Sequence, residues 1–234
     1  MRKHLPAALF FLVATLLFTF PLIIKPGSYI PGFFFTDEPY GNIWEIWRIS
    51  YSLHHNLSLG HTQLMCYPFG FTPYADGYIA YLWVSLVVFF SKFTPPLIVY
   101  NMQLLSNMFF SGLFAYLLAY YVTGKNRYAG FFTGIIFAFC PYQFSRLWQH
   151  LGLTYNQWIP LSLLAAIYLK FKTSKQSIAL LFLSLILLLS FDWSVMYFTF
   201  IALVVFIIYC IYGVIKNSLR KKKNFMSGLR HIYT

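Results

Sequence analysis

The 234-residue chain has very little charge: only 9% of its residues are charged, and just 5 of them are acidic. Hydrophobic residues make up 59% of the chain, and apolar runs of membrane-span length recur along it. A hydrocarbon core about 30 Å thick needs about 20 apolar residues per helix. With no stretch polar enough for a soluble domain, the sequence predicts a single membrane domain over residues 1–234, an all-α, polytopic transmembrane helix bundle.

Cysteine is scarce as well; the three residues are Cys66, Cys140 and Cys210. They form no CxxC motif, which argues against a disulfide framework. His54, His55 and His61 precede Cys66, but their spacing fits no zinc signature, so we expect no metal at these residues. We also find no internal repeat of the kind that marks many transporters.

The apolar runs predict about six spans. They cover residues 5–24, 97–122, 127–141, 154–170, 176–191 and 194–215. An outer loop, residues 25–96, separates the first two spans and is the only segment with room for an active site. Residues 216–234 form a basic cytoplasmic tail.

The apolar segment 78–93 has about 16 residues, a length typical of re-entrant or interfacial helices. If it does not cross the membrane, thirteen of the 17 basic residues lie on the cytoplasmic side and all 5 acids can lie on the other. If it crosses, every later basic loop moves outside and the positive-inside rule fails. We therefore predict a non-crossing helix, a cytoplasmic N-terminus and a multi-pass protein of the cell membrane.

The formal net charge of +12 reflects the basic residues that this topology places on the cytoplasmic side. The run Arg220-Lys221-Lys222-Lys223 lies just cytoplasmic of a predicted span, where basic clusters are expected and attract anionic lipid headgroups. We therefore expect membrane lipid, and no nucleic acid, as a partner.

Within the outer loop, residues 40–56 have the pattern of an amphipathic helix. Trp44, Trp47, Tyr51 and His54 fall on one stripe. Helices with Trp and Tyr on their apolar side lie along a membrane interface. Such a helix would hold the preceding residue Asp37 at headgroup depth.

Asp37 and the adjacent Glu38 are the candidate catalytic residues. A carboxylate beside an apolar surface can act as a general base, with a pKa tuned by burial and neighbours. The two acids can instead ligate a divalent cation, Mg²⁺ or Mn²⁺, that grips a phosphate. An aspartate at the end of a span can also be only a cap or a topological marker, as Asp76 can at the start of the 78–93 helix.

Four further residues are candidates for substrate binding: Arg146, His150, Asp76 and Arg48. Arg146 and His150 have i,i+4 spacing, so a helix places both on one face. A guanidinium on the outer side suits a phosphate or pyrophosphate oxygen of a substrate. The alternative for Arg146 is contact with lipid phosphate, and His150 can donate to the same group or be an interfacial ring.

The order of several motifs resembles the GT-C superfamily of integral-membrane glycosyltransferases, among them mannosyltransferase-like and oligosaccharyltransferase-like proteins. The motifs are Thr36-Asp-Glu-Pro-Tyr-Gly-Asn-Ile-Trp-Glu-Ile-Trp, Tyr67-Pro-Phe-Gly, Tyr100-Asn, Gly112-Leu-Phe-Ala-Tyr-Leu-Leu, Ala129-Gly-Phe-Phe-Thr-Gly, His150-Leu and Asn156-Gln-Trp-Ile-Pro-Leu. The resemblance implies a sugar donor on a polyprenyl phosphate or pyrophosphate, an acceptor of unidentified class, and Asp37 as the catalytic residue. The second acid of the family's paired-acid motif is missing, because residues 142–154 contain no Asp or Glu. A metal-independent route therefore fits better, with Asp37 deprotonating the acceptor and Arg146 steadying the lipid phosphate.

The chain is shorter than members of that superfamily usually are. We therefore keep three alternatives: a truncated copy lacking a C-terminal part or a partner subunit, a non-catalytic membrane subunit, and a polyprenyl-lipid flippase or transporter. A transporter is expected to place ionisable residues within its spans. This sequence has essentially none there.

Overall fold

The computed structural model describes residues 2–31, 37–72, 81–171, 174–189, 197, 199–209 and 212. Their contacts group the chain into two units, Met1–Val195 and Met196–Thr234. The second unit contributes one described apolar helix, Thr199–Tyr209, which falls in the predicted span 194–215.

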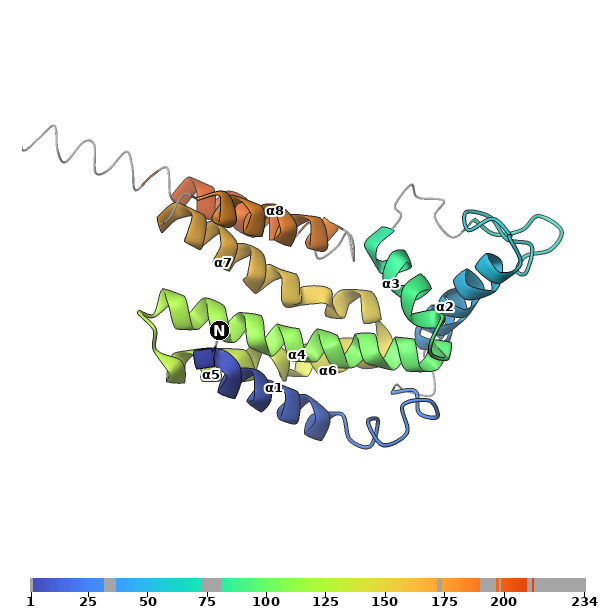
Figure 1. Ribbon diagram of the computed structural model, residues 1–234, viewed down its shortest axis with the longest axis horizontal. Coiled ribbons are helices and arrows are strands. Elements are labelled where there is room, and N and C mark those ends of the chain that lie inside the picture. Colours follow the sequence, from blue (N-terminus) through green and yellow to red (C-terminus); the bar gives the residue numbers. More distant parts are fainter. Residues whose placement is uncertain are drawn as a thin grey trace, which may run out of the picture. The chain divides into compact units, whose positions relative to one another are not determined.

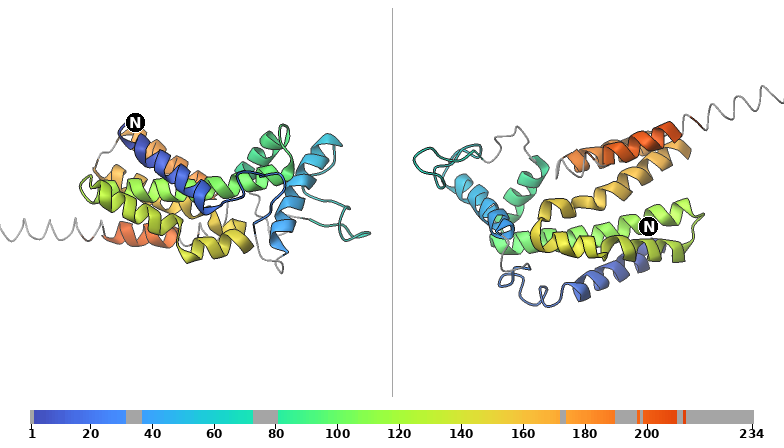
Figure 2. Two further views of the ribbon diagram at one scale, coloured as in Figure 1. Left: turned by 90° about the horizontal axis from the view of Figure 1, so that it is seen from below. Right: turned by 180° about the vertical axis from the view of Figure 1, so that it is seen from behind.

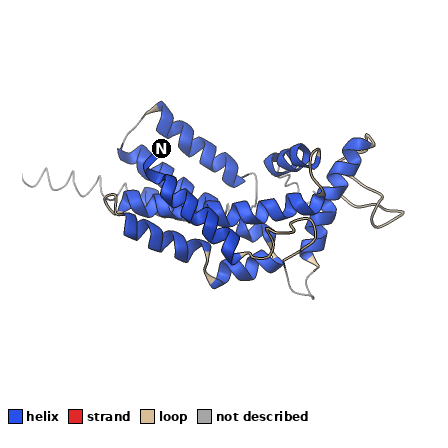
Figure 3. Cartoon of the chain, turned by 60° about the horizontal axis from the view of Figure 1, so that its bottom comes forward, coloured by secondary structure: helices blue, strands red, loops and turns tan. Residues whose placement is uncertain are grey.

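The first unit is helical, and its described part contains no strand (Figure 3). Its helices are η1 (Arg2–His4), α1 (Leu5–Phe18), α2 (Glu38–His54), α3 (Tyr81–Ser91), α4 (Pro96–Val122), α5 (Arg127–Ala138), α6 (Pro141–Gln149), η2 (Leu151–Gln157), α7 (Trp158–Phe171) and α8 (Lys175–Leu189). The prediction of an all-α fold is confirmed for the described residues.

Helix α4 is the central element of the unit, and it contacts α1, α2, α3, α5, α7 and η2 (Figure 1). With 27 residues, it is the one described helix long and apolar enough to cross a membrane. It matches the predicted span 97–122 within one residue at its start.

Three of the other predicted spans differ from the described helices in their bounds. Helix α1 has 14 residues, about 21 Å at 1.5 Å per residue, and ends at Phe18, three residues before Pro21. The predicted span 127–141 is interrupted after α5, because Cys140 is extended and Pro141 begins a new helix, α6. The predicted span 154–170 begins as the 3₁₀ helix η2. Within the described residues one helix, α4, has membrane-spanning length, and the number of spans stays a prediction.

Helices α1, α4 and α5 pack closely through two glycines. A Cβ atom added to Gly112 of α4 would lie 2.4 Å from Cδ1 of Phe11 on α1. A Cβ atom added to Gly134 of α5 would lie 2.4 Å from Cζ of the same Phe11. Phe11 is fully buried between them. Small residues let helix backbones approach in this way, especially where helices pack in lipid.

Helices α2 and α3 contact each other and α4 near Pro96, the first residue of α4 (Figure 2). Helix α2 agrees with the predicted helix over residues 40–56, and α3 lies within the predicted 78–93 segment, of which residues 78–80 fall outside the described ranges. The buried face of α2 includes Ile46 and Ile49, whereas Trp47 is exposed and stacks on Tyr51. The aromatic stripe thus lies outside the protein core.

Candidate functional site

Glu38 and His150 form an acid–histidine contact between two helical segments of the first unit. The Nδ1 atom of His150 is hydrogen-bonded to Oε2 of Glu38, across 112 residues of sequence. Glu38 is the first residue of α2, and His150 follows the last residue of α6. Both side chains are accessible, with 39% of Glu38 and 43% of His150 exposed. The pair is therefore open to a substrate.

Hydrophobic packing on both sides of His150 holds it against α2. Leu147 and Leu151 are buried in the same core cluster as Ile46 and Ile49 of α2. The backbone N–H of His150 also donates to the carbonyl oxygen of Arg146 at 2.7 Å, which ends α6 at this residue. Two helices that are distant in sequence thus bring Glu38 and His150 together by burying their leucine and isoleucine neighbours.

Asp37 lies at the N-cap position of α2, and its side chain is exposed. Its carboxylate makes no side-chain capping hydrogen bond, although an N-cap aspartate commonly makes one. The cap interpretation of Asp37 therefore has no support from this geometry. Asp37 directly precedes Glu38, the acid of the Glu38–His150 pair, in the sequence.

The chain that leads to Asp37 is tied to α4 by Asn101. The Nδ2 atom of Asn101, which is fully buried, donates to the carbonyl oxygens of Pro26 at 2.6 Å and Tyr29 at 2.8 Å. This bond pair anchors the turn after α1 near the start of α4. The outer loop therefore begins from a fixed position.

Arg146 lies one helical turn before His150 on α6. Its guanidinium carbon is 5.5 Å from the centre of the Tyr142 ring, a cation–π distance. Among the described residues it makes no ion pair, and its Nε atom is buried without a hydrogen-bond partner. The positive charge of Arg146 is thus not compensated by any described acid.

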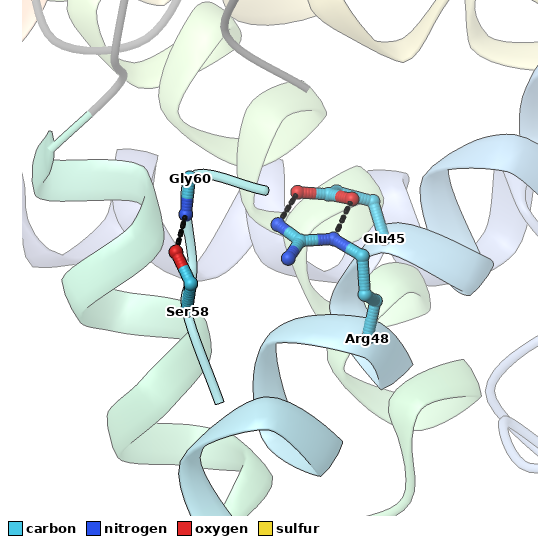
Figure 4. A network of polar contacts seen from close by, with 4 residues as sticks. All are labelled: Glu45, Arg48, Ser58 and Gly60. Carbon is cyan, nitrogen blue, oxygen red and sulfur yellow. Dashed lines mark hydrogen bonds and ion pairs between the residues drawn. The ribbon is translucent and has the colours of Figure 1, made fainter. Parts of the chain in front are cut away.

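Arg48 requires a correction as a candidate for substrate binding. Its side chain is fully buried, and its guanidinium donates to both carboxylate oxygens of Glu45, at 2.7 Å and 2.6 Å (Figure 4). The same figure shows the loop after α2, where the backbone N–H of Gly60 donates to Oγ of Ser58 at 3.2 Å. A buried guanidinium with bidentate pairing has no surface for a phosphate, so we withdraw Arg48 from the candidate set.

Asp76, the remaining candidate, lies outside the described residues, and its role stays a prediction. Within the described ranges, no three His, Cys, Asp or Glu side chains gather in a metal-binding arrangement.

A buried polar network between α4, α6 and η2 was not predicted. Asn107 Nδ2 donates to Thr154 Oγ1 at 2.8 Å, and Gln157 Nε2 donates to Asn107 Oδ1 at 3.0 Å. In a second chain of hydrogen bonds, Ser111 Oγ donates to Oδ1 of Asn156, and Nδ2 of Asn156 donates to Oε1 of Gln143. The signal was present in the sequence: Gln103, Asn107 and Ser111 are spaced by four residues in an otherwise apolar helix.

Beside this network lies a cavity of about 270 Å³. Its walls come from α3, α4, η2 and the start of α7. The lining residues are Leu86, Phe90, Val99, Met102, Gln103, Ser106, Asn107, Phe110, Tyr155, Gln157 and Trp158. None of them carries a charge.

Comparisons with family models, curated proteins and solved structures give no match to this chain. The functional argument therefore depends on the residues and their geometry.

Proposed function

We propose that this protein is a membrane glycosyltransferase of the GT-C type. It would transfer a sugar from a polyprenyl phosphate or pyrophosphate to an acceptor on the non-cytoplasmic face. The observation that carries the proposal is the convergence of Asp37–Glu38 and the Arg146–His150 turn at the Pro96 end of α4. Acids and a cation from two separate outer segments are what a glycosyl phosphate needs: a base for the acceptor and a positive charge for the leaving group.

The distribution of charge along α4 supports the orientation. Glu38 and Glu45 belong to α2, which packs near Pro96, while Lys3 lies 5.9 Å from the rings of Tyr120 and Tyr121 at the other end. Lys125 and Arg127 follow α4 at that same end. Basic residues collect on the cytoplasmic side of membrane proteins. We therefore propose that the Pro96 end faces the non-cytoplasmic side, and the six predicted spans remain part of this proposal.

The reaction assigns Asp37 as the base. An acceptor hydroxyl attacks the anomeric carbon, its proton passes to the Asp37 carboxylate, and the bond from that carbon to the phosphate oxygen breaks. The bond electrons leave with the lipid phosphate. Asp37 suits this role because its carboxylate is exposed and makes no capping bond.

Arg146 and His150 would bind the leaving phosphate. The uncompensated guanidinium of Arg146 can pair with phosphate oxygens, and this charge-assisted contact strengthens as negative charge develops on the leaving group. Because Glu38 is bonded to Nδ1 of His150, the ring is oriented and its Nε2 atom remains for the substrate. Glu38 is thus a positioning residue.

A transfer assay in membrane vesicles tests the function. Vesicles containing the wild-type protein receive a panel of radiolabelled polyprenyl-phosphate sugars, with empty membranes as the blank and a chelator arm to test for a divalent cation. We expect transfer above the blank for one donor class. A well-expressed protein that transfers no sugar from any donor would contradict the proposal and favour a non-catalytic subunit.

A further inference from the structure

The cavity beside α4 follows that helix lengthwise. Four of its lining residues are spaced by three or four positions and so share one face of α4: Val99, Met102, Ser106 and Phe110. The distance along the helix axis from Val99 to Phe110 is about 16 Å at 1.5 Å per residue. The cavity is therefore a groove parallel to α4, and we call it the α4 groove.

The side chains that line the opening of the α4 groove have free surface. On α3, Leu86 and Phe90 are spaced i,i+4 and are 37% and 41% exposed. Met102 of α4 is 54% exposed, and Ser106 and Phe110 are half-buried. A ligand that enters between α3 and α4 therefore meets accessible, mostly apolar side chains.

Aromatic rings form the end of the groove that lies furthest from Pro96. The ring of Phe110 stacks on that of Phe114, with centroids 5.3 Å apart, and Phe114 lies 6.1 Å from the ring of Trp158. Phe110 and Trp158 both line the groove. The groove thus ends at a packed aromatic wall contributed by α4 and α7.

The polar side chains of the lining make hydrogen bonds within the protein. The hydroxyl of Tyr155 donates to Oε1 of Gln103 at 3.3 Å, and Ser106 Oγ donates to the carbonyl oxygen of Gln103 at 2.7 Å. Gln157 Nε2 donates to Oδ1 of Asn107 at 3.0 Å. Among the described residues, none that lines the groove carries a formal charge, so an ionic headgroup would be desolvated there without a counter-charge. The groove therefore suits a hydrocarbon chain.

The position of the groove along α4 matches the depth of one membrane leaflet. With 27 residues, α4 is about 40 Å long, roughly 5 Å longer at each end than a hydrocarbon core of about 30 Å. Val99 lies about 5 Å along the helix from Pro96 and Phe110 about 21 Å, so the groove runs from the hydrocarbon boundary to near the midplane. In the orientation proposed above, this is the non-cytoplasmic leaflet.

We propose that the α4 groove binds one acyl chain of a phospholipid from the non-cytoplasmic leaflet, with the chain end at Phe110 and Trp158. The volume of about 270 Å³, roughly nine liquid-water volumes, accommodates part of one chain. Phospholipid chains are the most concentrated hydrocarbon in a bilayer, so mass action favours them over a scarce polyprenyl lipid. The choice of leaflet rests on the proposed orientation, whereas binding of the chain does not depend on sugar transfer.

The test maps crosslinks on the purified full chain in phospholipid nanodiscs. Two phospholipid probes carry a diazirine on one acyl chain, either near the glycerol or at the chain end. We expect the chain-end probe to label Phe110 or Trp158 and the glycerol-side probe to label α4 near Val99. Label at Phe132, which is 69% exposed on α5, gives the reference for lipid contact at the protein surface.

Two variants at one position test whether the groove itself holds the chain. Ser106→Leu places a larger side chain in the middle of the groove, whereas Ser106→Ala leaves the groove open and is the matched control. Relative to label at Phe132, label at Phe110 and Trp158 is expected to fall about tenfold in Ser106→Leu, the effect of excluding about two methylene groups. Ser106→Ala is expected to match the wild type. Equal labelling of Phe110 and Trp158 in both variants would overturn the proposal.

Three further results would also overturn it. Label at Phe132 without label at Phe110 or Trp158 would show that chains contact the protein surface but do not enter the groove. The reverse order of the two probes along α4 would place the chain in the other leaflet. Loss of label after addition of a small mole fraction of unlabelled polyprenyl phosphate would identify a prenyl chain as the occupant. Because no sugar transfer is measured, each result is independent of the proposed enzyme activity.

Discussion

The two ends of α4 each hold a histidine, and the two are placed very differently. At the Pro96 end, His150 is half-exposed and bonded to Glu38. At the Val122 end, the ring of His4 lies 5.8 Å from that of Tyr116 and 5.0 Å from that of Tyr120, and neither of its nitrogens has a hydrogen-bond partner among the described residues. Burial, followed by the charge of Lys3, lowers the pKa of His4 below its ordinary value.

This comparison separates a histidine that can do chemistry from one that packs. His150 has an acid to orient one nitrogen and a side chain that is 43% exposed, an arrangement that suits a substrate-binding imidazole. His4 is surrounded by rings and cations, which favour the neutral form and offer no orienting partner. The accessible acid–histidine pair thus lies at one end of α4, and a histidine packed among tyrosine rings lies at the other.

The largest effect is expected from Glu45→Gln, which removes a carboxylate with a structural role near the Pro96 end of α4. It removes the carboxylate that binds the fully buried Arg48, and loss of one partner of a buried pair costs about 3–5 kcal/mol. Thermal unfolding in detergent is expected to show a marked loss of stability. Because Arg48→Met removes the guanidinium that Glu45 pairs with, the double variant should recover part of the lost stability; a stable Glu45→Gln protein would contradict the structural role.

The next effect concerns Arg146. Arg146→Gln leaves the fold intact, since the guanidinium makes no ion pair with described residues, but removes the charge proposed to bind the leaving phosphate. Sugar transfer is expected to fall about 10²-fold or more. Arg146→Lys should restore only part of it, because an ammonium lacks the planar fork. Lys92→Gln, an exposed outer cation on another segment, is the matched control; an equal loss in both variants would indicate a general charge effect.

A smaller effect is expected from separating Glu38 and His150. Glu38→Gln and His150→Gln should each reduce transfer, and the double variant should be little worse than either, because both changes remove the same contact. A double-mutant cycle on the transfer rate measures this coupling. Additive losses would show that the two side chains act separately.

The smallest effect is expected at His4. With a folded-state pKa below the unfolded value, the unfolded chain binds the additional proton, so stability declines as the pH falls through about 6.5 and is retained above it. His4→Phe should remove this part of the pH dependence of unfolding while leaving sugar transfer unchanged. A loss of transfer in His4→Phe would contradict the division between the two ends.

Helices with a clear apolar or amphipathic pattern were predicted closely from the sequence. Helix types and boundaries that depend on the backbone conformation were not. Helix α4 is mostly apolar between Pro96 and Val122, and α2 has clear amphipathic spacing, so both were located closely. The predicted span 127–141 ends where the structure has its break, since Cys140 is extended and Pro141 begins α6. The 3₁₀ helix η2 at the start of the predicted span 154–170 was not predicted, because hydropathy does not distinguish a 3₁₀ helix from an α-helix.

The candidate site was predicted by residue type but not by partner. Asp37, Glu38, Arg146 and His150 were named as candidates, yet the Glu38–His150 pairing joins positions 112 residues apart and depends on packing of α6 against α2. For Arg48, the i,i+3 spacing to Glu45 was visible, but its complete burial was not. Burial is a property of the tertiary structure, and it decides which of two similar arginines is accessible.

The most direct measurement compares the wild type with Asp37→Asn in right-side-out vesicles that carry the accepted polyprenyl-phosphate sugar in the outer leaflet. Asp37→Asn keeps the size and polarity of the side chain but cannot take the acceptor proton, so transfer is expected to fall by at least about 10²-fold. Expression and thermal unfolding are expected to match the wild type, because the carboxylate makes no capping bond. Transfer at the wild-type rate in Asp37→Asn would contradict the assignment of the catalytic base and, with it, the proposed site.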